Sequence, residues 1–157
     1  RFTVLLPAVP DDQMPSASAF LGQLAGLDEL LPVARSLHVL VVDNEPDIVA
    51  ATIALVESLG HSAKGAADIA AALDQIGNAD VLLADYHLDR GEDGLRLIDL
   101  ARTRNPALAV ALVTAENGAA LRNRLRLGRI ALFVKPADPA AIGAFLAEVS
   151  HRQIKSE

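Results

Sequence analysis

Four short apolar runs, each followed directly by a polar or charged residue, constrain what this chain can fold into. The runs are Val39-Leu40-Val41-Val42, Val81-Leu82-Leu83-Ala84, Val110-Ala111-Leu112-Val113 and Ile130-Ala131-Leu132-Phe133-Val134. Continuous apolar runs of this length are typical of strands that are buried on both faces of a parallel sheet. The strands of such a sheet all end at one edge, which is where ligands bind. The polar residues after the runs are therefore expected to share one site.

These polar residues indicate a particular chemistry. The four runs are followed, in chain order, by Asp43, Asp85, Thr114 and Lys135. Two carboxylates, one hydroxyl and one ammonium at the same edge suit a divalent cation together with a phosphoryl group. The alternative is that the two acids only form turns, that Thr114 is an ordinary strand residue and that Lys135 is solvated. That alternative requires four coincidences at once.

Stretches with apolar residues at helical spacing alternate with these strands from residue 38 onward. The expected helices include residues 48–59, 69–76, 95–101, 117–127 and 142–149, and a short additional strand is expected over 61–65. The result is a five-fold alternation of strand and helix. Such an alternation predicts a doubly wound parallel sheet with right-handed crossovers.

Composition limits the other classes of function. The chain has 157 residues, of which 52% are apolar, and no run approaches the roughly 20 apolar residues of a membrane span. The formal charge of −6 argues against a general nucleic-acid coat. With no cysteine, disulfides and thiolate metal sites are excluded. We therefore expect a cytoplasmic segment that contacts neither nucleic acid nor membrane directly.

Four segments resemble the phosphorylation motifs of two-component receiver domains, in the family's order and at close to its spacing. They are HVLVVDNEPDIV, LLADYHLDRGEDGL, ALVTAE and LFVKPAD. The resemblance implies an α/β, flavodoxin-like, five-stranded parallel sheet with strand order 2-1-3-4-5. It covers about residues 37–150 and leaves 151–157 as a tail.

The first 36 residues do not share the alternation of strand and helix. The opening RFTVLLPAVP is similar to the last strand of a histidine-kinase ATP-binding domain, so residues 1–10 are expected to be a remnant of one. Residues 11–36 would then be a linker with a possible helix, whose apolar stripe contains Phe20, Leu24, Leu27 and Leu31. This arrangement favours a piece of a hybrid sensor histidine kinase. The parent protein would be a histidine kinase, which could be anchored in a membrane, whereas this segment itself would not be a kinase.

The resemblance also implies a role for each site residue. Asp85 would accept a phosphoryl group from the phosphohistidine of a kinase dimerisation and phosphotransfer domain, or of a histidine phosphotransfer protein. Thr114 and Lys135 would bind the transferred group. A Mg²⁺ cofactor would be held by Asp43, Asn44, Asp85 and the backbone carbonyl of His87.

Several positions depart from the family pattern. Asn44 stands where most receivers have Asp, Asp89 where proline is common, and Leu132 where many carry a Tyr or Phe switch. Phe133 is adjacent to Leu132, but strand alternation points it to the opposite face. These departures motivate one alternative, a pseudo-receiver that binds partners without being phosphorylated. A stand-alone response regulator is a second alternative.

A third alternative is a haloacid-dehalogenase-like phosphatase, which requires a second Asp two residues after the nucleophile. That position is His87, which could instead modulate attack of water on the phosphoryl group or contribute only its carbonyl. The other histidines have no ligand partners at a recognisable spacing. A basic stretch carries Arg122, Arg124, Arg126 and Arg129, which form either a solvated face or a surface for a partner or a second copy of the chain.

Overall fold

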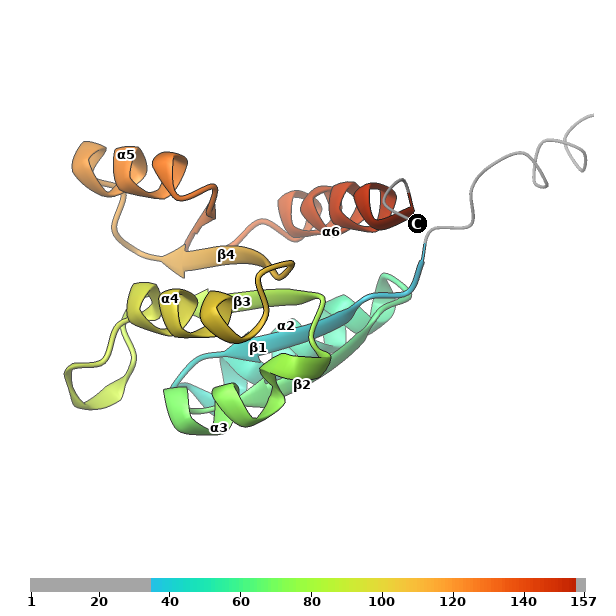
Figure 1. The fold of residues 1–157 in the computed structure, drawn as a ribbon, viewed down its shortest axis with the longest axis horizontal. Helices are drawn as coiled ribbons and strands as arrows, with labels where there is room; N and C mark the ends of the chain where they lie inside the picture. Colours follow the sequence, from blue (N-terminus) through green and yellow to red (C-terminus); the bar gives the residue numbers. More distant parts are fainter. Residues whose placement is uncertain (1–34, 155–157) are drawn as a thin grey trace, which may run out of the picture. The chain divides into compact units, whose positions relative to one another are not determined.

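The computed structural model describes residues 35–154, in which strands and helices alternate along the chain (Figure 1). The strands are β1 (His38–Val42), β2 (Ser62–Ala66), β3 (Val81–Asp85), β4 (Ala109–Thr114) and β5 (Ala131–Val134). The helices are α2 (Pro46–Ser58), α3 (Ile69–Gln75), α4 (Gly94–Arg104), α5 (Ala119–Leu127) and α6 (Pro139–Ile154). Two 3₁₀ turns, η2 (Ile76–Asn78) and η3 (Asp89–Gly91), complete these elements. The expected kinase remnant and the linker up to residue 34 lie outside the described residues.

The five strands form one parallel sheet in the order β2-β1-β3-β4-β5, as expected. The chain steps from β1 outward to β2 and then crosses back to β3 on the other side of β1. The direction of winding therefore reverses between β1 and β3. In open α/β sheets, ligands bind beside the carboxyl ends of the two strands at this reversal.

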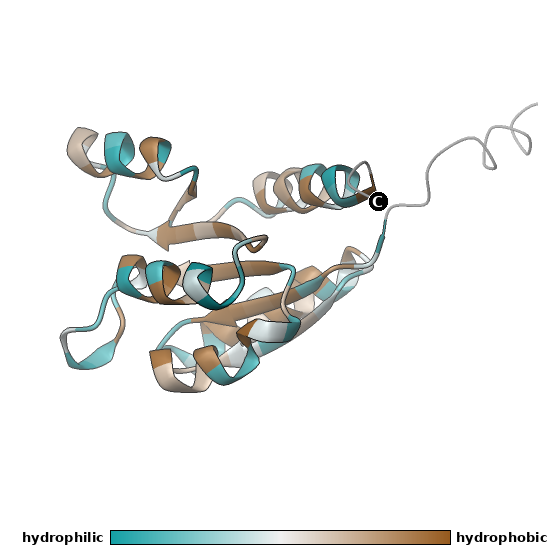
Figure 2. Cartoon of the chain, viewed as in Figure 1, coloured by the Kyte–Doolittle hydropathy of each residue, from teal (hydrophilic) through white to brown (hydrophobic). Residues whose placement is uncertain are grey.

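Side-chain alternation on the strands builds two separate cores, one on each face of the sheet. Leu40 and Val42 of β1 pack with α3 and α4, whereas Val39 and Val41 pack with α2 and α6. The central strands β1, β3 and β4 are continuously apolar along most of their length (Figure 2). β3 is buried along its whole length because it lies in the centre of the sheet and is covered on both faces.

β2 lies at the edge of the sheet, which is why its sequence is less continuously apolar than those of the central strands. Its sequence, SAKGA, alternates between exposed and partly buried residues, and Lys64 stands on the exposed side. Charged residues on an edge strand discourage pairing with other chains. Gly65 is required by packing, since a Cβ there would lie 2.4 Å from Cγ1 of Val49 on α2. The strand covers Ser62–Ala66, one residue later than expected.

The last helix continues beyond the expected boundary at residue 150. α6 runs to Ile154, so the first four residues of the expected tail, 151–154, are helical. Ser150 is fully buried, and its hydroxyl donates a hydrogen bond of 2.8 Å to the backbone carbonyl of Arg35. An ion pair between Glu148 and Arg152 spans the next turn. No proline or glycine interrupts these residues, so the helix continues.

None of the helices within residues 35–154 is long and apolar enough to cross a membrane.

The start of α4 packs directly against the backbone of Asp85. The carboxylate of Asp93 caps this helix by accepting a hydrogen bond of 2.7 Å from the amide of Arg96. A Cβ placed on Gly94 would lie 2.3 Å from the carbonyl oxygen of Asp85 and 2.8 Å from Cδ1 of Leu112. Only glycine therefore allows the helix to begin this close to β3.

We predict that Gly94→Ala lowers the free energy of unfolding by about 1–3 kcal/mol, the usual cost of overpacking a core. The backbone of Asp85 cannot move aside without disturbing the sheet. The matched control is Gly77→Ala, because a Cβ at Gly77 would meet no atom within 4 Å. That control should change stability by no more than about 0.5 kcal/mol. Urea unfolding of both variants measures the difference, and equal stabilities would contradict the packing described for α4.

Candidate functional site

Three buried polar side chains lie at the carboxyl ends of adjacent central strands. Within residues 35–154 the buried polar or charged residues are Asp43, Asp85, Thr114 and Ser150. Asp43 directly follows β1, and Asp85 and Thr114 are the last residues of β3 and β4. These three strands are neighbours in the sheet, and the three residues are 4%, 5% and 0% exposed. Buried carboxylates are costly unless they are paired. Their gathering at this edge therefore requires a compensating positive group.

Lys135 is that positive group. It directly follows β5, and its Nζ lies 3.2 Å from Oδ2 of Asp43 and 3.2 Å from Oδ1 of Asp85. Burial acts to lower the pKa of Lys135, but hydrogen bonds to both carboxylates and their charges outweigh burial, so the pKa is raised above its ordinary 10.5. The ammonium is thus charged at neutral pH and offsets one of the two negative charges.

The loop after β1 fixes the orientation of the Asp43 carboxylate. Its Oδ1 accepts a hydrogen bond of 2.9 Å from the backbone amide of Glu45, which leaves Oδ2 directed at Lys135. Such a side-chain bond to the backbone two residues on is a common turn device of Asp. The neighbouring Asn44 donates from Nδ2 to Oδ1 of Asp89 at 2.9 Å. This contact between two loops was not expected from the sequence.

We call Asp43, Asp85 and Lys135 the charged group, and the Thr114 hydroxyl forms no hydrogen bond with their side chains. Its Oγ1 accepts a hydrogen bond of 3.0 Å from the amide of Glu116, and its backbone carbonyl accepts one of 2.8 Å from the amide of Lys135. The structure thus brings Asp43, Asp85 and Lys135 into direct contact. It keeps Thr114 one strand away, with its hydroxyl engaged by the following loop.

His87 and Glu116 pair across the loops that follow β3 and β4. Nε2 of His87 lies 3.0 Å from Oε1 of Glu116, and both side chains are exposed. The backbone of His87 is held by an antiparallel bridge to Asp93. Glu116 was missed in the sequence, although its position two residues after Thr114 mirrors that of His87 after Asp85.

The charged group opens onto a cavity of about 720 Å³ between α2 and α6. Asp43, Asp85 and Lys135 lie at one end of it, and the remainder is lined mostly by aliphatic side chains such as Ile48, Leu55 and Ile142, together with Asp47 and Thr52. The buried carboxylates are thereby reachable by a small ligand from outside the fold.

The donor set fits a Mg²⁺ ion. Two carboxylates from β1 and β3 converge on the single cationic group of Lys135, which shows that their oxygens can face one cation. Mg²⁺ prefers oxygen ligands and retains several waters, so few protein ligands are required. No three His, Cys, Asp or Glu side chains within residues 35–154 cluster closely enough to hold a metal by themselves. Further oxygens would have to come from groups such as the Asn44 amide and the His87 carbonyl.

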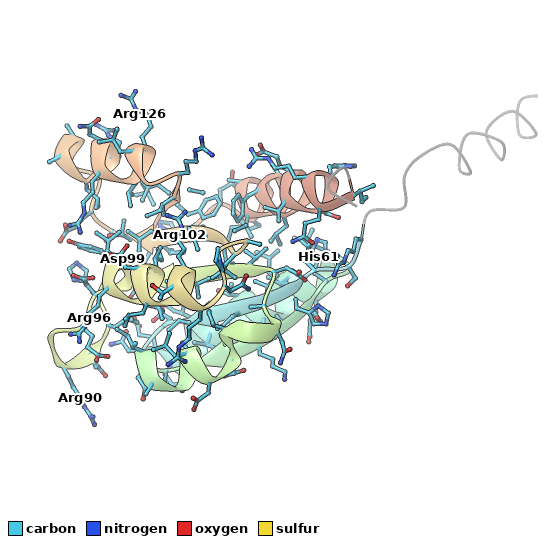
Figure 3. All side chains as sticks on the ribbon, in the orientation of Figure 1. His61, Arg90, Arg96, Asp99, Arg102 and Arg126 are labelled. Carbon is cyan, nitrogen blue, oxygen red and sulfur yellow. The ribbon has the colours of Figure 1, made fainter. Side chains whose placement is uncertain are left out.

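Two other histidines, His61 and His38, have structural partners. Nδ1 of His61 accepts a hydrogen bond of 3.2 Å from the amide of Leu37, and burial lowers the pKa of His61. His61 lies just before β2, away from the strand ends that carry the charged group (Figure 3). His38 contacts Asp80 at 3.3 Å.

The basic residues of α5 face outward, as Arg126 illustrates in Figure 3. The nearby Arg102 instead points inward and donates hydrogen bonds to the carbonyls of Gly128 and Arg129, at 2.6 Å and 3.2 Å. Arg102 therefore ties α4 to the turn between α5 and β5.

The fold and this group of residues define a receiver domain of two-component signalling. The family model described as the response regulator receiver domain matches residues 39–147, and the chain belongs to this family. The expectation raised by the four motifs is therefore confirmed, as are the sheet and its strand order. No curated protein matches this chain in sequence.

Solved structures share the fold at low sequence identity. A CheY-like receiver domain from Methanospirillum hungatei JF-1 is 22% identical with a TM-score of 0.69, over 78% of this chain and 100% of that one. The receiver domain of an HD domain-containing protein from Pseudomonas fluorescens Pf-5 is 22% identical with a TM-score of 0.68, over 80% and 94%. The anti-anti-sigma factor PhyR from Bartonella quintana is 21% identical with a TM-score of 0.64, over 88% of this chain but only 56% of its own length.

We predict that the double variant Asp43→Asn with Asp85→Asn lowers the pKa of Lys135 below 10.5, because burial remains while both carboxylates are lost. In the wild type the stabilising effect of the ammonium is complete below pH 10.5 and is lost only as the pH rises through the raised pKa. An NMR titration of the Lys135 ε-methylene measures the shift. Asp99→Asn on the exposed side of α4 is the control and should keep the pKa raised. An unchanged pKa in the double variant would show that the two carboxylates do not act on Lys135.

Proposed function

We propose that this receiver domain accepts a phosphoryl group on Asp85 in a two-component phosphorelay, with Mg²⁺ as the cofactor. The observation that carries the proposal is the convergence of two buried carboxylates on Lys135 at the carboxyl ends of β1 and β3, the strands between which the direction of winding reverses. A purely structural ion pair would be a costly choice here, since buried charge pairs commonly stabilise a fold no better than apolar residues.

The proposed reaction is transfer from phosphohistidine to a carboxylate. A carboxylate oxygen of Asp85 attacks phosphorus and forms a P–O bond. The P–N bond breaks, and its electron pair returns to the imidazole nitrogen, which takes up a proton. An acyl phosphate on Asp85 and a free histidine result, and covalent chemistry of this kind is known from enzymes that form an aspartyl phosphate.

The neighbouring residues would position and neutralise the transferred group. Lys135 would exchange its contact with Asp85 for one to a phosphoryl oxygen, because its point charge suits phosphate. The Thr114 hydroxyl would reach the same group after leaving the Glu116 amide. Mg²⁺, held by Asp43, Asp85, Asn44 and the His87 carbonyl, would offset the negative charge on the phosphoryl oxygens.

We further propose that the chain is the receiver portion of a hybrid sensor histidine kinase. Residues 1–10 would be the end of its ATP-binding domain and 11–36 the linker. The phosphodonor would be a kinase dimerisation and phosphotransfer domain or a histidine phosphotransfer protein. The resemblance of RFTVLLPAVP to a kinase strand supports this arrangement.

A pseudo-receiver that binds partners without phosphorylation is the second candidate function. Leu132 favours it, because this residue lies on the α3 and α4 face while the ring of Phe133 packs on the opposite face against Phe145, with ring centres 5.8 Å apart. The usual aromatic switch is therefore not reproduced by the neighbouring residue.

Incubation with Mg²⁺ and acetyl phosphate is expected to add one phosphoryl group to the chain, at Asp85. Intact-mass measurement should detect the added group in the wild type and in the Asp99→Asn control, and should find none in Asp85→Asn. The experiment separates the two candidates, since a pseudo-receiver would gain no mass under any of these conditions. Labelling of Asp85→Asn at the wild-type level would refute the assignment of Asp85.

A further inference from the structure

The contact between Asn44 and Asp89 gives the departures at these two positions a common explanation. Oδ1 of Asp89 lies 2.9 Å from Nδ2 of Asn44. An ionised carboxylate can only accept hydrogen bonds, so the amide group that faces Asp89 must be the NH₂. The amide oxygen of Asn44 is thereby turned away from Asp89 and kept as an acceptor.

The loop that carries Asp89 is built to hold it in place. Leu88 is buried in the core, and its amide donates a hydrogen bond of 3.1 Å to the carbonyl of Glu92. The η3 turn closes with a bond of 3.3 Å from the amide of Glu92 to the carbonyl of Asp89. The tight turn requires a φ of 64° at Arg90, a left-handed conformation that is unfavourable for residues other than glycine. Its side chain points into solvent at the tip of the loop, so its backbone conformation serves the turn (Figure 3).

Asp89 adds a negative charge near the charged group of Asp43, Asp85 and Lys135. Asp43 and Asp85 carry two negative charges, of which Lys135 offsets one. Asp89 adds a third carboxylate that reaches the site through the amide of Asn44. Within residues 35–154, Asp89 forms no cluster of three potential metal ligands with other His, Cys, Asp or Glu side chains, and its side chain instead contacts the amide of Asn44.

We propose that Asp89 is a positioning residue that orients the amide oxygen of Asn44 toward the cation and supplies the negative charge that an acid at position 44 would carry. The proposal rests on the proposed function of the Asp85 site. Partners of this kind, hydrogen-bonded to a metal ligand, strengthen binding by fixing and polarising that ligand.

Four variants test the proposal. Asp89→Ala removes the carboxylate, Asp89→Asn removes the charge but keeps an acceptor for Asn44, and Asn44→Asp with Asp89→Asn exchanges the two side chains. Glu92→Gln is the matched control, since it removes an acid from the same loop whose carboxylate has no hydrogen bond or ion pair with any described residue. Asn44→Asp alone is less informative, because it places two carboxylates at hydrogen-bond distance.

Mg²⁺ titration calorimetry should show affinity reduced by about tenfold in Asp89→Ala, the lower end of the effect of such partners. Asp89→Asn should lose less Mg²⁺ affinity than Asp89→Ala. The exchange variant should bind Mg²⁺ at least as tightly as the wild type, and Glu92→Gln should bind it with the wild-type affinity. In metal-free protein, the side-chain amide NMR signals of Asn44 should shift in Asp89→Ala and stay in place in Glu92→Gln.

The outcomes separate this proposal from the proposed function. If the wild type binds Mg²⁺ and is phosphorylated by acetyl phosphate while Asp89→Ala matches Glu92→Gln, the positioning role is refuted alone. An exchange variant that binds Mg²⁺ as weakly as Asp89→Ala would refute it as well. A wild type that binds no Mg²⁺ would refute both proposals.

Discussion

The paired contacts of Lys135 with Asp43 and Asp85 are the interaction on which the rest of the site depends. Each carboxylate is almost fully buried, and one ammonium lies 3.2 Å from both. Removing one partner of a buried ion pair is typically far more destabilising than replacing the whole pair. Three strand ends must therefore stay in register for the charges to remain compensated. The register of the strands and the contacts within the charged group therefore depend on each other.

The packing around the site supports the same geometry from outside. Gly94 lets α4 begin against the backbone of Asp85, and the amide of Gly94 donates to the carbonyl of Tyr86 at 2.9 Å. Loop contacts between His87 and Glu116, and between Asn44 and Asp89, join segments that are far apart in sequence. The strands thus position the buried charges, while the loops determine which polar atoms surround them.

Family membership and function rest on different observations in this protein. The three solved structures named here that share the fold are all less than 25% identical in sequence to this chain. A shared fold supports many activities, so these structures do not identify the function. The case for phosphoryl transfer comes from the contacts of Asp43, Asp85 and Lys135. Under the proposed function, the departure at Asn44 would bear on cation binding and through it on phosphoryl transfer, whereas the departure at Leu132 would bear only on signal output. A domain of this kind can keep its chemistry while its conformational response differs.

The sequence by itself determined the sheet, its buried strands and the residues at their ends, because parallel strands covered on both faces leave unmistakable apolar runs. It also predicted that Phe133 and Leu132 face opposite sides, since strand alternation is a local property. The edge strand and the end of α6 were less accurately placed, because neither depends on continuous burial. Only the tertiary structure decided that Asn44 meets Asp89, that His87 meets Glu116 and that Thr114 bonds to the Glu116 amide. These contacts are set by how loops close over the sheet, and no periodic pattern in the sequence records that closure.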